Sequence, residues 1–185
     1  PEEAINAALD VLRSGRLHRY NLLADETSQV ALLEKEFAES VGAKYCLAVA
    51  SGGYALSTAL RALGTGVGDN VLTNAFTLAP VPGAIVSIGA NPIYIDVNEN
   101  LVIDFDHLIK KADQANVLLL SHMRGHMCDM DKLMEICNAN NLLVVEDCAH
   151  TMGAKWGNTG SGRFGSMGCF STQTYKHLNS GEGGL

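Results

Sequence analysis

The stretch Val144 to Gly184, VVEDCAHTMGAKWGNTGSGRFGSMGCFSTQTYKHLNSGEGG, contains two short apolar segments that are each followed by polar residues. The first predicted strand, 142–146, is followed directly by Asp147, and the second, 168–171, leads into a polar, glycine-flanked loop that carries Lys176. Ligands of open α/β sheets bind beyond the carboxyl ends of the strands. The stretch therefore predicts an acid and a lysine at one edge of a sheet.

The same alternation of apolar strands and amphipathic helices extends through the chain from residue 28. We expect helices near 2–14, 29–41, 53–63, 78–88, 105–112 and 130–139, and strands near 45–50, 70–74, 92–96, 117–121, 142–146 and 168–171. This order is typical of βαβ crossovers and a parallel sheet covered on both faces. It predicts a three-layer α/β/α domain over 28–185, preceded by a helical segment over 1–27.

Composition excludes several classes of function. The 185 residues are 47% hydrophobic and 18% charged with a net charge of −7, which is ordinary for a soluble globular protein and gives no basic patch for nucleic acid. No apolar run approaches the ~20 residues of a membrane span, and the acidic start is unlike a signal peptide. Five cysteines without a C-x-x-C pair favour reduced core thiols. We expect a cytoplasmic protein without membrane or nucleic-acid partners.

Asp147 and Lys176 are the pair of side chains that a pyridoxal 5'-phosphate (PLP) enzyme needs. A lysine forms an imine with the cofactor aldehyde, and a carboxylate keeps the pyridine nitrogen protonated so that the ring accepts electrons. The neighbouring Glu146 could be mistaken for this carboxylate, but strand alternation places it on the opposite side. We therefore predict Asp147 and Lys176 as catalytic residues.

The segments EDCAH, GSMGCFS and YKHLNSGEGG resemble the DegT/DnrJ/StrS family of fold-type I aminotransferases. The likeness continues upstream through ASGGYALSTALRALGTGVGDNV, NAFTLAP, GANPIYIDV and GHMCDMDKLMEIC, and so covers most of the chain from Ala31 onward. The resemblance implies the large, PLP-binding domain of an aspartate aminotransferase-like fold. Relatives begin another strand and then a smaller domain after Gly184, so we expect a chain truncated before the C-terminal small domain, one that aggregates or binds cofactor weakly.

The resemblance implies a phosphate site formed by Gly52, Gly53, Tyr54 and Ser171. The helix that follows Ser51 offers backbone amides to a phosphate dianion. Relatives usually carry a threonine or serine at the position of Gly53 or Tyr54, so we expect backbone amides to bind more of the phosphate here. The alternatives are an ordinary strand-to-helix turn and a strand-end serine bonded to backbone.

Phe76 and His150 match two further cofactor contacts of the family. Phe76 in NAFTLAP corresponds to an aromatic that stacks on the cofactor ring, and His150 stands where relatives carry glutamine or histidine near its phenolic oxygen. A core phenylalanine and a structural histidine are the alternatives. Together with Ser51–Gly53, His122, Asp147 and Ser171, Phe76 is expected to project toward one edge of the sheet.

Arg124 is a departure from the resemblance, because relatives usually have an apolar or aromatic residue there. An arginine could bind a substrate carboxylate or phosphate, or it could be solvated. The roles of Arg124 and His122 stay open at this point.

Two further motifs are set aside. Residues 160–165 satisfy G-x-G-x-x-G, but no helix is expected after them, so a dinucleotide would find no helix N-terminus. His122, His126 and Cys128 have the chemistry of zinc ligands, but Gly125 interrupts any helix that would align them. We expect no metal site.

The resemblance implies a homodimer with shared active sites that transfers an amino group from glutamate or glutamine to a keto group, on a nucleotide-linked sugar. A PLP-dependent sugar dehydratase is one alternative, although dehydratases of the family replace the lysine with histidine. A non-catalytic partner subunit would bind PLP without turnover, and an α/β domain without this chemistry would stay colourless when PLP is added.

Overall fold

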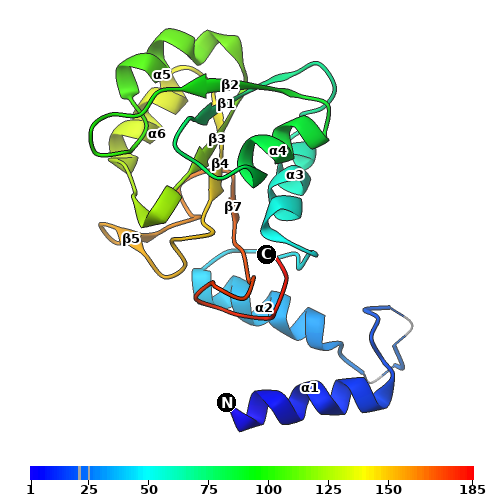
Figure 1. The fold of residues 1–185 in the computed structure, drawn as a ribbon. Coiled ribbons are helices and arrows are strands. Elements are labelled where there is room, and N and C mark those ends of the chain that lie inside the picture. Colours follow the sequence, from blue (N-terminus) through cyan, green and yellow to red (C-terminus); the bar gives the residue numbers. More distant parts are fainter. Residues whose placement is uncertain (21, 25) are drawn as a thin grey trace.

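The structure, a computed structural model, describes residues 1–20, 22–24 and 26–185. Five parallel strands form one sheet in the order β2-β1-β3-β4-β7, and a separate antiparallel hairpin pairs β5 with β6 (Figure 1). The strands are β1 Asn70–Asn74, β2 Asn91–Ile95, β3 Val117–Ser121, β4 Leu143–Asp147, β5 Lys155–Trp156, β6 Thr159–Gly160 and β7 Met167–Cys169. The helices are α1 Glu2–Ser14, α2 Gln29–Val41, α3 Gly52–Ala62, α4 Pro80–Ser87, α5 Phe105–Lys111 and α6 Met130–Ala139, with 3-10 turns η1 Ala112–Gln114 and η2 Met123–Gly125.

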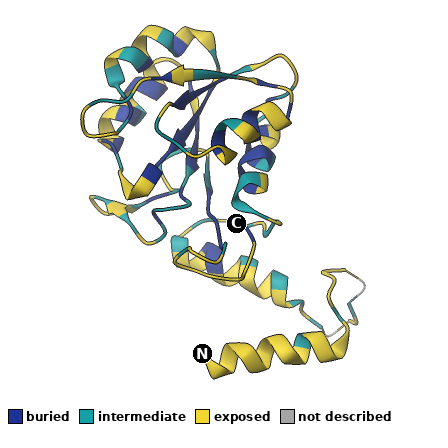
Figure 2. Ribbon diagram, viewed as in Figure 1, coloured by how far each residue is buried: buried dark blue, intermediate teal, exposed yellow. Residues whose placement is uncertain are grey.

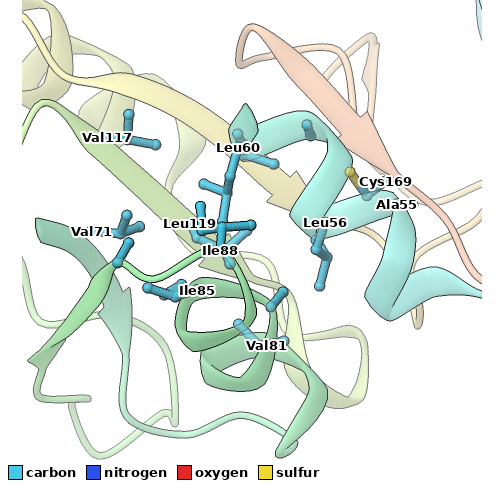
Figure 3. Close-up of a cluster of buried hydrophobic side chains, with 14 residues drawn as sticks. Ala55, Leu56, Leu60, Val71, Val81, Ile85, Ile88, Val117, Leu119 and Cys169 are labelled. Carbon is cyan, nitrogen blue, oxygen red and sulfur yellow. The ribbon is translucent and has the colours of Figure 1, made fainter. Parts of the chain in front are cut away.

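Alternate residues of the central strands pack into two separate cores, which confirms the three-layer α/β class. Val71, Leu119 and Val145 face α3 and α4 in one core (Figure 3), whereas Leu72, Leu118, Leu120 and Val144 face α5 and α6 in the other. Figure 2 shows the central strands as the most buried part of the molecule. Strands buried on both faces need apolar residues at every position, which explains the near-continuous run VLLL in β3.

The carboxyl ends of β1 and β3 lie at the topological switch point of the sheet. The chain runs from β1 to β2 on one side and then crosses to β3 on the other side of β1. In doubly wound sheets this reversal opens a crevice in which ligands bind. The site is therefore expected beyond Asn74 and Ser121, the last residues of β1 and β3.

Local sequence signals account for most helix boundaries. Serine and aspartate side chains cap α2, α3, α5 and α6 by accepting an amide three residues further on, from Ser28, Ser51, Asp104 and Asp129. α1 and α2 end at glycines in the left-handed conformation. The predicted helices and five of the six predicted strands are present with small shifts at their ends.

The strand predicted over 45–50 is wrong. In the described part of the chain, the pairing of this segment is a single antiparallel bridge between Val49 and Gly184. Apolar alternation alone does not make a strand, because each strand needs a neighbour along its length for its backbone hydrogen bonds. The β5–β6 hairpin and the two 3-10 turns were not predicted.

Helix α1 has no buried residue and lies apart from the sheet (Figures 1 and 2). The division of the chain into 1–27 and 28–185 stays a prediction. Among the described residues, no helix has the length and apolar character needed to cross a membrane.

Candidate active site

Asp147 ends β4 with its carboxylate held at two points. Its Oδ2 accepts a hydrogen bond from Ser121 Oγ at 2.8 Å, and its Oδ1 accepts one from the Ala149 amide at 3.1 Å. A carboxylate offers about four acceptor positions, so Asp147 keeps acceptor capacity for a ligand. Its side chain is half-buried, at the sheet edge where the switch point lies.

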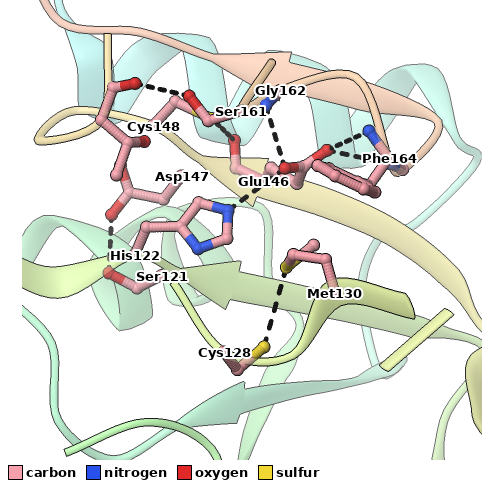
Figure 4. A network of polar contacts seen from close by, with 12 residues as sticks. Ser121, His122, Cys128, Met130, Glu146, Asp147, Cys148, Ser161, Gly162 and Phe164 are labelled. Carbon is pink, nitrogen blue, oxygen red and sulfur yellow. Dashed lines mark hydrogen bonds and ion pairs between the residues drawn. The ribbon is translucent and has the colours of Figure 1, made fainter. Parts of the chain in front are cut away.

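Glu146 faces the other way and is fully buried, as strand alternation predicts (Figure 4). Its Oε2 accepts from the Gly162 amide at 2.9 Å and lies 3.1 Å from His122 Nε2, while its Oε1 accepts from the amides of Phe164 and Gly165, each at 2.8 Å. Burial alone would raise the pKa of Glu146, but the hydrogen bonds from His122, Gly165 and Gly162 outweigh it and lower the pKa. Glu146 is therefore an internal anion with its acceptor positions filled.

His122 is not part of the sheet-edge site, which corrects the expectation that it projects there. Its ring is 1% exposed and pairs with Glu146. The reason is strand alternation: β3 places Ser121 on the side of Asp147, so the next residue turns inward. His122 also keeps the two strands in register, because its amide donates to the Asp147 carbonyl at 3.1 Å.

His122, Glu146 and Cys148 bring three possible metal-ligand atoms within 4.8 Å of one another. The donors around Glu146 already occupy its oxygens, and burial, followed by the charges of Glu146 and Asp147, raises the pKa of the Cys148 thiol well above its usual range. A neutral thiol and a saturated carboxylate are poor ligands. We therefore interpret His122, Glu146 and Cys148 as a buried cluster that stabilises the fold and not as a metal site.

The glycine-rich segment 160–165 binds the protein's own carboxylate. It begins at Gly160, the last residue of β6, and no helix begins after it in the described chain, as the sequence indicated. Three of its amides point at Glu146, so the segment is an anion-binding loop turned inward. Sequence reasoning missed this partnership, although a buried glutamate beside a loop rich in free amides is the signal that could have found it.

Lys176 lies on a loop whose base is closed by hydrogen bonds. The Thr172 amide donates to the Gly183 carbonyl at 3.0 Å, and the Thr174 amide donates to the Gly181 carbonyl at 2.9 Å. Burial lowers the pKa of the half-buried Lys176 amine, and the negative charge of Asp147 opposes that shift. The structure thus brings Lys176 within electrostatic reach of Asp147, with an amine that loses its proton more readily than a solvated lysine.

Gly52 and Ser171 lie against each other at the start of α3. A Cβ atom on Gly52 would be 2.9 Å from Ser171 Cβ, so only glycine fits there without a shift. Ser51 Oγ accepts the Tyr54 amide at 3.1 Å, so that amide is already used, whereas this cap leaves the amides of Gly52 and Gly53 free. The Tyr54 side chain is 56% exposed. The geometry suits an anion between Gly52, Gly53 and Ser171.

Phe76 and His150 border the same edge. The Asn74 side chain donates to the Phe76 carbonyl at 3.1 Å, and His150 Nδ1 accepts the Arg124 amide at 3.2 Å. Burial lowers the pKa of His150, and the positive charge of Lys176 adds to this effect. Arg124 is exposed and has a left-handed backbone with φ 58°. These contacts place Phe76, His150 and Arg124 around the switch point, and their roles stay predictions.

An apolar cavity of about 610 Å³ lies elsewhere, between α2, α3 and the open edge of β7. It is lined by none of the predicted site residues. The groups with shifted pKa values that line this cavity are the thiols of Cys46 and Cys169, whose pKa burial raises. Lys176 and His150, whose pKa values burial lowers, do not line it, so the switch point is the better candidate for chemistry.

The chain is similar to sugar and cyclitol aminotransferases. It is 39% identical to a Micromonospora echinospora protein named as an L-glutamine:3-amino-2,3-dideoxy-scyllo-inosose aminotransferase, over 82% of this chain and 37% of that one. It is 33% identical to GDP-perosamine synthase of Escherichia coli O157:H7, over 88% of this chain and 45% of that one. An aminotransferase structure from Psychrobacter cryohalolentis matches with a TM-score of 0.90 and 32% identity, over 100% of this chain and 46% of that one.

The chain thus spans less than half the length of these relatives. The model of the DegT/DnrJ/EryC1/StrS aminotransferase family matches residues 1–185, the whole of the sequence. The chain therefore belongs to the DegT/DnrJ/EryC1/StrS aminotransferase family.

Proposed function

We propose that the protein is a PLP-dependent aminotransferase that transfers an amino group from glutamate or glutamine to a keto group on a nucleotide-linked sugar. PLP is the cofactor of the family. The similarity to GDP-perosamine synthase supports a nucleotide-linked acceptor. The higher identity to the scyllo-inosose enzyme favours a cyclitol ketone as a second candidate acceptor.

The residues present fit PLP. The close approach of Gly52 and Ser171, together with the amides of Gly52 and Gly53, which donate to no group in the described part of the chain, suits a phosphate. The remaining acceptor capacity of Asp147 suits a protonated pyridine nitrogen. Phe76 is proposed to contact the ring, and His150 to lie near the phenolic oxygen. When bound, PLP supplies an electron-accepting ring that stabilises a carbanion beside the transferred amino group.

Lys176 is proposed to bind the cofactor and to move the proton during transfer. A lowered amine pKa increases the fraction of neutral amine, which is the form that acts as a nucleophile and as a base. Asp147 is proposed to accept from the ring nitrogen with the capacity that the hydrogen bonds from Ser121 and Ala149 leave on its carboxylate. The neutral His150 that its lowered pKa favours accepts the Arg124 amide and leaves one N–H for a ligand.

The observation that supports the proposal is that the charge of Asp147 acts on the Lys176 amine, against the lowering of its pKa by burial. Borohydride reduction of the PLP-loaded protein followed by peptide mass mapping tests it directly. We expect one reduced cofactor on the peptide that contains Lys176. A modified Lys155, or no modified lysine, would contradict the proposal.

A sugar dehydratase and a non-catalytic partner subunit would behave differently from an aminotransferase. A dehydratase would eliminate water from the sugar without a net gain of nitrogen, and a partner subunit would bind PLP without turnover. The presence of Lys176, with His177 beside it, favours amination. The homodimer with shared sites and the cytoplasmic location remain predictions, and sedimentation of the PLP-loaded protein tests the first of them.

A further inference from the structure

The carboxylate of Asp147 is the end of a hydrogen-bonded chain that begins at Asn74. Asn74 is 2% exposed, and its side-chain Oδ1 accepts the Ser121 amide at 2.8 Å while its Nδ2 donates to the Ser121 carbonyl at 3.1 Å. Ser121, which is 5% exposed, then donates its hydroxyl to Asp147 Oδ2 at 2.8 Å. Asn74 thus clamps both backbone groups of the residue whose hydroxyl holds Asp147.

This chain joins the two strands that flank the switch point. β1 and β3 pair through Leu72 with Leu118 and Thr73 with Leu119, and the Asn74 amide continues their connection one step beyond the ladder. The same Nδ2 also donates to the Phe76 carbonyl at 3.1 Å. One buried amide therefore ties together the predicted ring-stacking residue and the support of the predicted ring-nitrogen acid.

The orientation of an aspartate carboxylate needs such support. Its terminal torsion is broad and roughly two-fold, so the plane of the group is set by its partners. Ser121 Oγ binds one oxygen and the Ala149 amide binds the other, which fixes that plane. Ala149 lies only two residues beyond Asp147, in the loop that follows β4, whereas Ser121 belongs to the neighbouring strand β3. Ser121 is therefore the partner that fixes the carboxylate relative to the sheet.

We propose that Ser121, clamped by Asn74, is a positioning residue that fixes the plane of the Asp147 carboxylate for the cofactor's ring nitrogen. This inference rests on the proposed function. It assigns to Ser121 no contact with substrate. Its effect therefore appears in cofactor binding and in the chemical step, and not in substrate affinity.

The test compares Ser121→Ala with Ser121→Thr, which restores a hydroxyl, and with Thr73→Val as the matched control. Thr73 is buried on the neighbouring strand β1, and its hydroxyl has no partner in the described structure. For each variant we would measure the PLP dissociation constant by titration of the visible absorbance, and kcat and KM for the donor per mole of bound PLP.

Hydrogen bonds to charged groups set the scale of the expected loss. Ser121→Ala is expected to weaken PLP binding about three- to tenfold and to lower kcat about 10- to 100-fold, with the donor KM changed less than about twofold. Ser121→Thr should recover most of both losses, and Thr73→Val should match the wild type.

Three results would overturn the inference. Ser121→Ala that behaves like Thr73→Val, or Ser121→Thr that is as impaired as Ser121→Ala, would overturn it while the proposed function stands. A wild-type protein that binds no PLP would overturn the proposed function and this inference together. Because rates are referred to bound PLP, partial unfolding of a variant does not imitate the expected result.

Discussion

Glu146 and Asp147 are adjacent in the chain and carry the same functional group, but the fold gives them opposite surroundings. Glu146 is fully buried among three backbone amides and His122, toward the core that contains α5 and α6. Asp147 is half-buried at the sheet edge, with two donors on its carboxylate and acceptor capacity left over. One residue of strand alternation separates the two environments.

The difference between the two residues lies in how many acceptor positions of the carboxylate are already occupied by hydrogen bonds within the protein. A fully occupied carboxylate stabilises the fold, whereas one with free positions can bind a ligand. A buried charge is tolerated when hydrogen bonds satisfy it, and removing one partner leaves the others uncompensated. A carboxylate that must meet a ligand needs part of its capacity free. By this criterion Glu146 holds the loop 160–165 and β4 in place, and Asp147 is the residue available to a cofactor.

The largest effect is expected from Lys176→Ala, which alters the proposed active site around Asp147 and not the buried network around Glu146. The variant should keep some PLP affinity through Gly52, Ser171 and Asp147, and should lose at least about 10,000-fold in transamination because both the nucleophile and the proton carrier are gone. Steady-state assays with glutamate and a keto sugar would measure it. Turnover close to that of the wild type would show that another lysine serves the reaction.

On the structural side, Glu146→Gln is expected to lower the free energy of unfolding by about 3–5 kcal/mol, the usual cost of breaking a buried charge network. An amide of the same size places an N–H donor against the donors of Gly162 or of Phe164 and Gly165. Chemical denaturation measures the loss, and Glu135→Gln on the surface of α6 is the control. A loss below about 1 kcal/mol would mean that the network is dispensable.

Gly52→Ala is expected to weaken PLP binding about tenfold or more, because the charge-assisted hydrogen bonds proposed for the phosphate depend on the close approach of Gly52 and Ser171. The new methyl group would lie 2.9 Å from Ser171 Cβ and would push apart the two sides of the proposed phosphate site. In the control, Gly83→Ala, the methyl group meets no atom within 4 Å. Equal PLP affinity for the two variants would remove Gly52 from the site.

The smallest effect is expected from substitution of His150, and it should appear only in the pH dependence of stability and PLP binding. Burial and then Lys176 lower its pKa below the ordinary 6.5, so the folded state binds its proton less readily than the unfolded state. The stability associated with neutral His150 is present above pH 6.5 and is lost as the pH falls through the lowered pKa.

Stability and PLP loading should therefore decline on the acid side in the wild type, and His150→Gln, an amide that does not titrate, should flatten that decline. Unfolding and PLP titrations between pH 5 and pH 8 measure both curves. If stability and PLP loading fall in the same way below pH 6.5 in the wild type and in His150→Gln, another titrating group causes the decline.

Local pattern was enough to predict most of the fold. Strand and helix periodicity identified β1, β3 and β4, and alternation along β4 separated Glu146 from Asp147. The segment 45–50 shows the limit of this reasoning, because an apolar run becomes a strand only where the fold supplies a partner, and a single bridge from Val49 to Gly184 is what it finds.

Residue types in the sequence predicted the candidate site residues, but they did not predict the hydrogen bonds that hold Asp147 in place. The bond between Ser121 and Asp147 joins residues 26 positions apart, and the Asn74 clamp joins residues 47 positions apart. His122 was assigned to the wrong side because the position at which β3 ends decides which of two neighbours faces the site. Contacts between distant segments are set by packing, which one-dimensional patterns do not contain.

The most direct test of the account compares Asp147→Asn with Glu146→Gln by the rate of amino transfer per mole of folded, PLP-loaded protein. We predict that Asp147→Asn loses at least about 100-fold, or roughly 2.7 kcal/mol of transition-state stabilisation, because a neutral amide does not keep the ring nitrogen protonated. Glu146→Gln should stay within about tenfold of the wild type once unfolded protein is discounted. An active Asp147→Asn beside an inactive, folded Glu146→Gln would contradict the assignment of the two carboxylates.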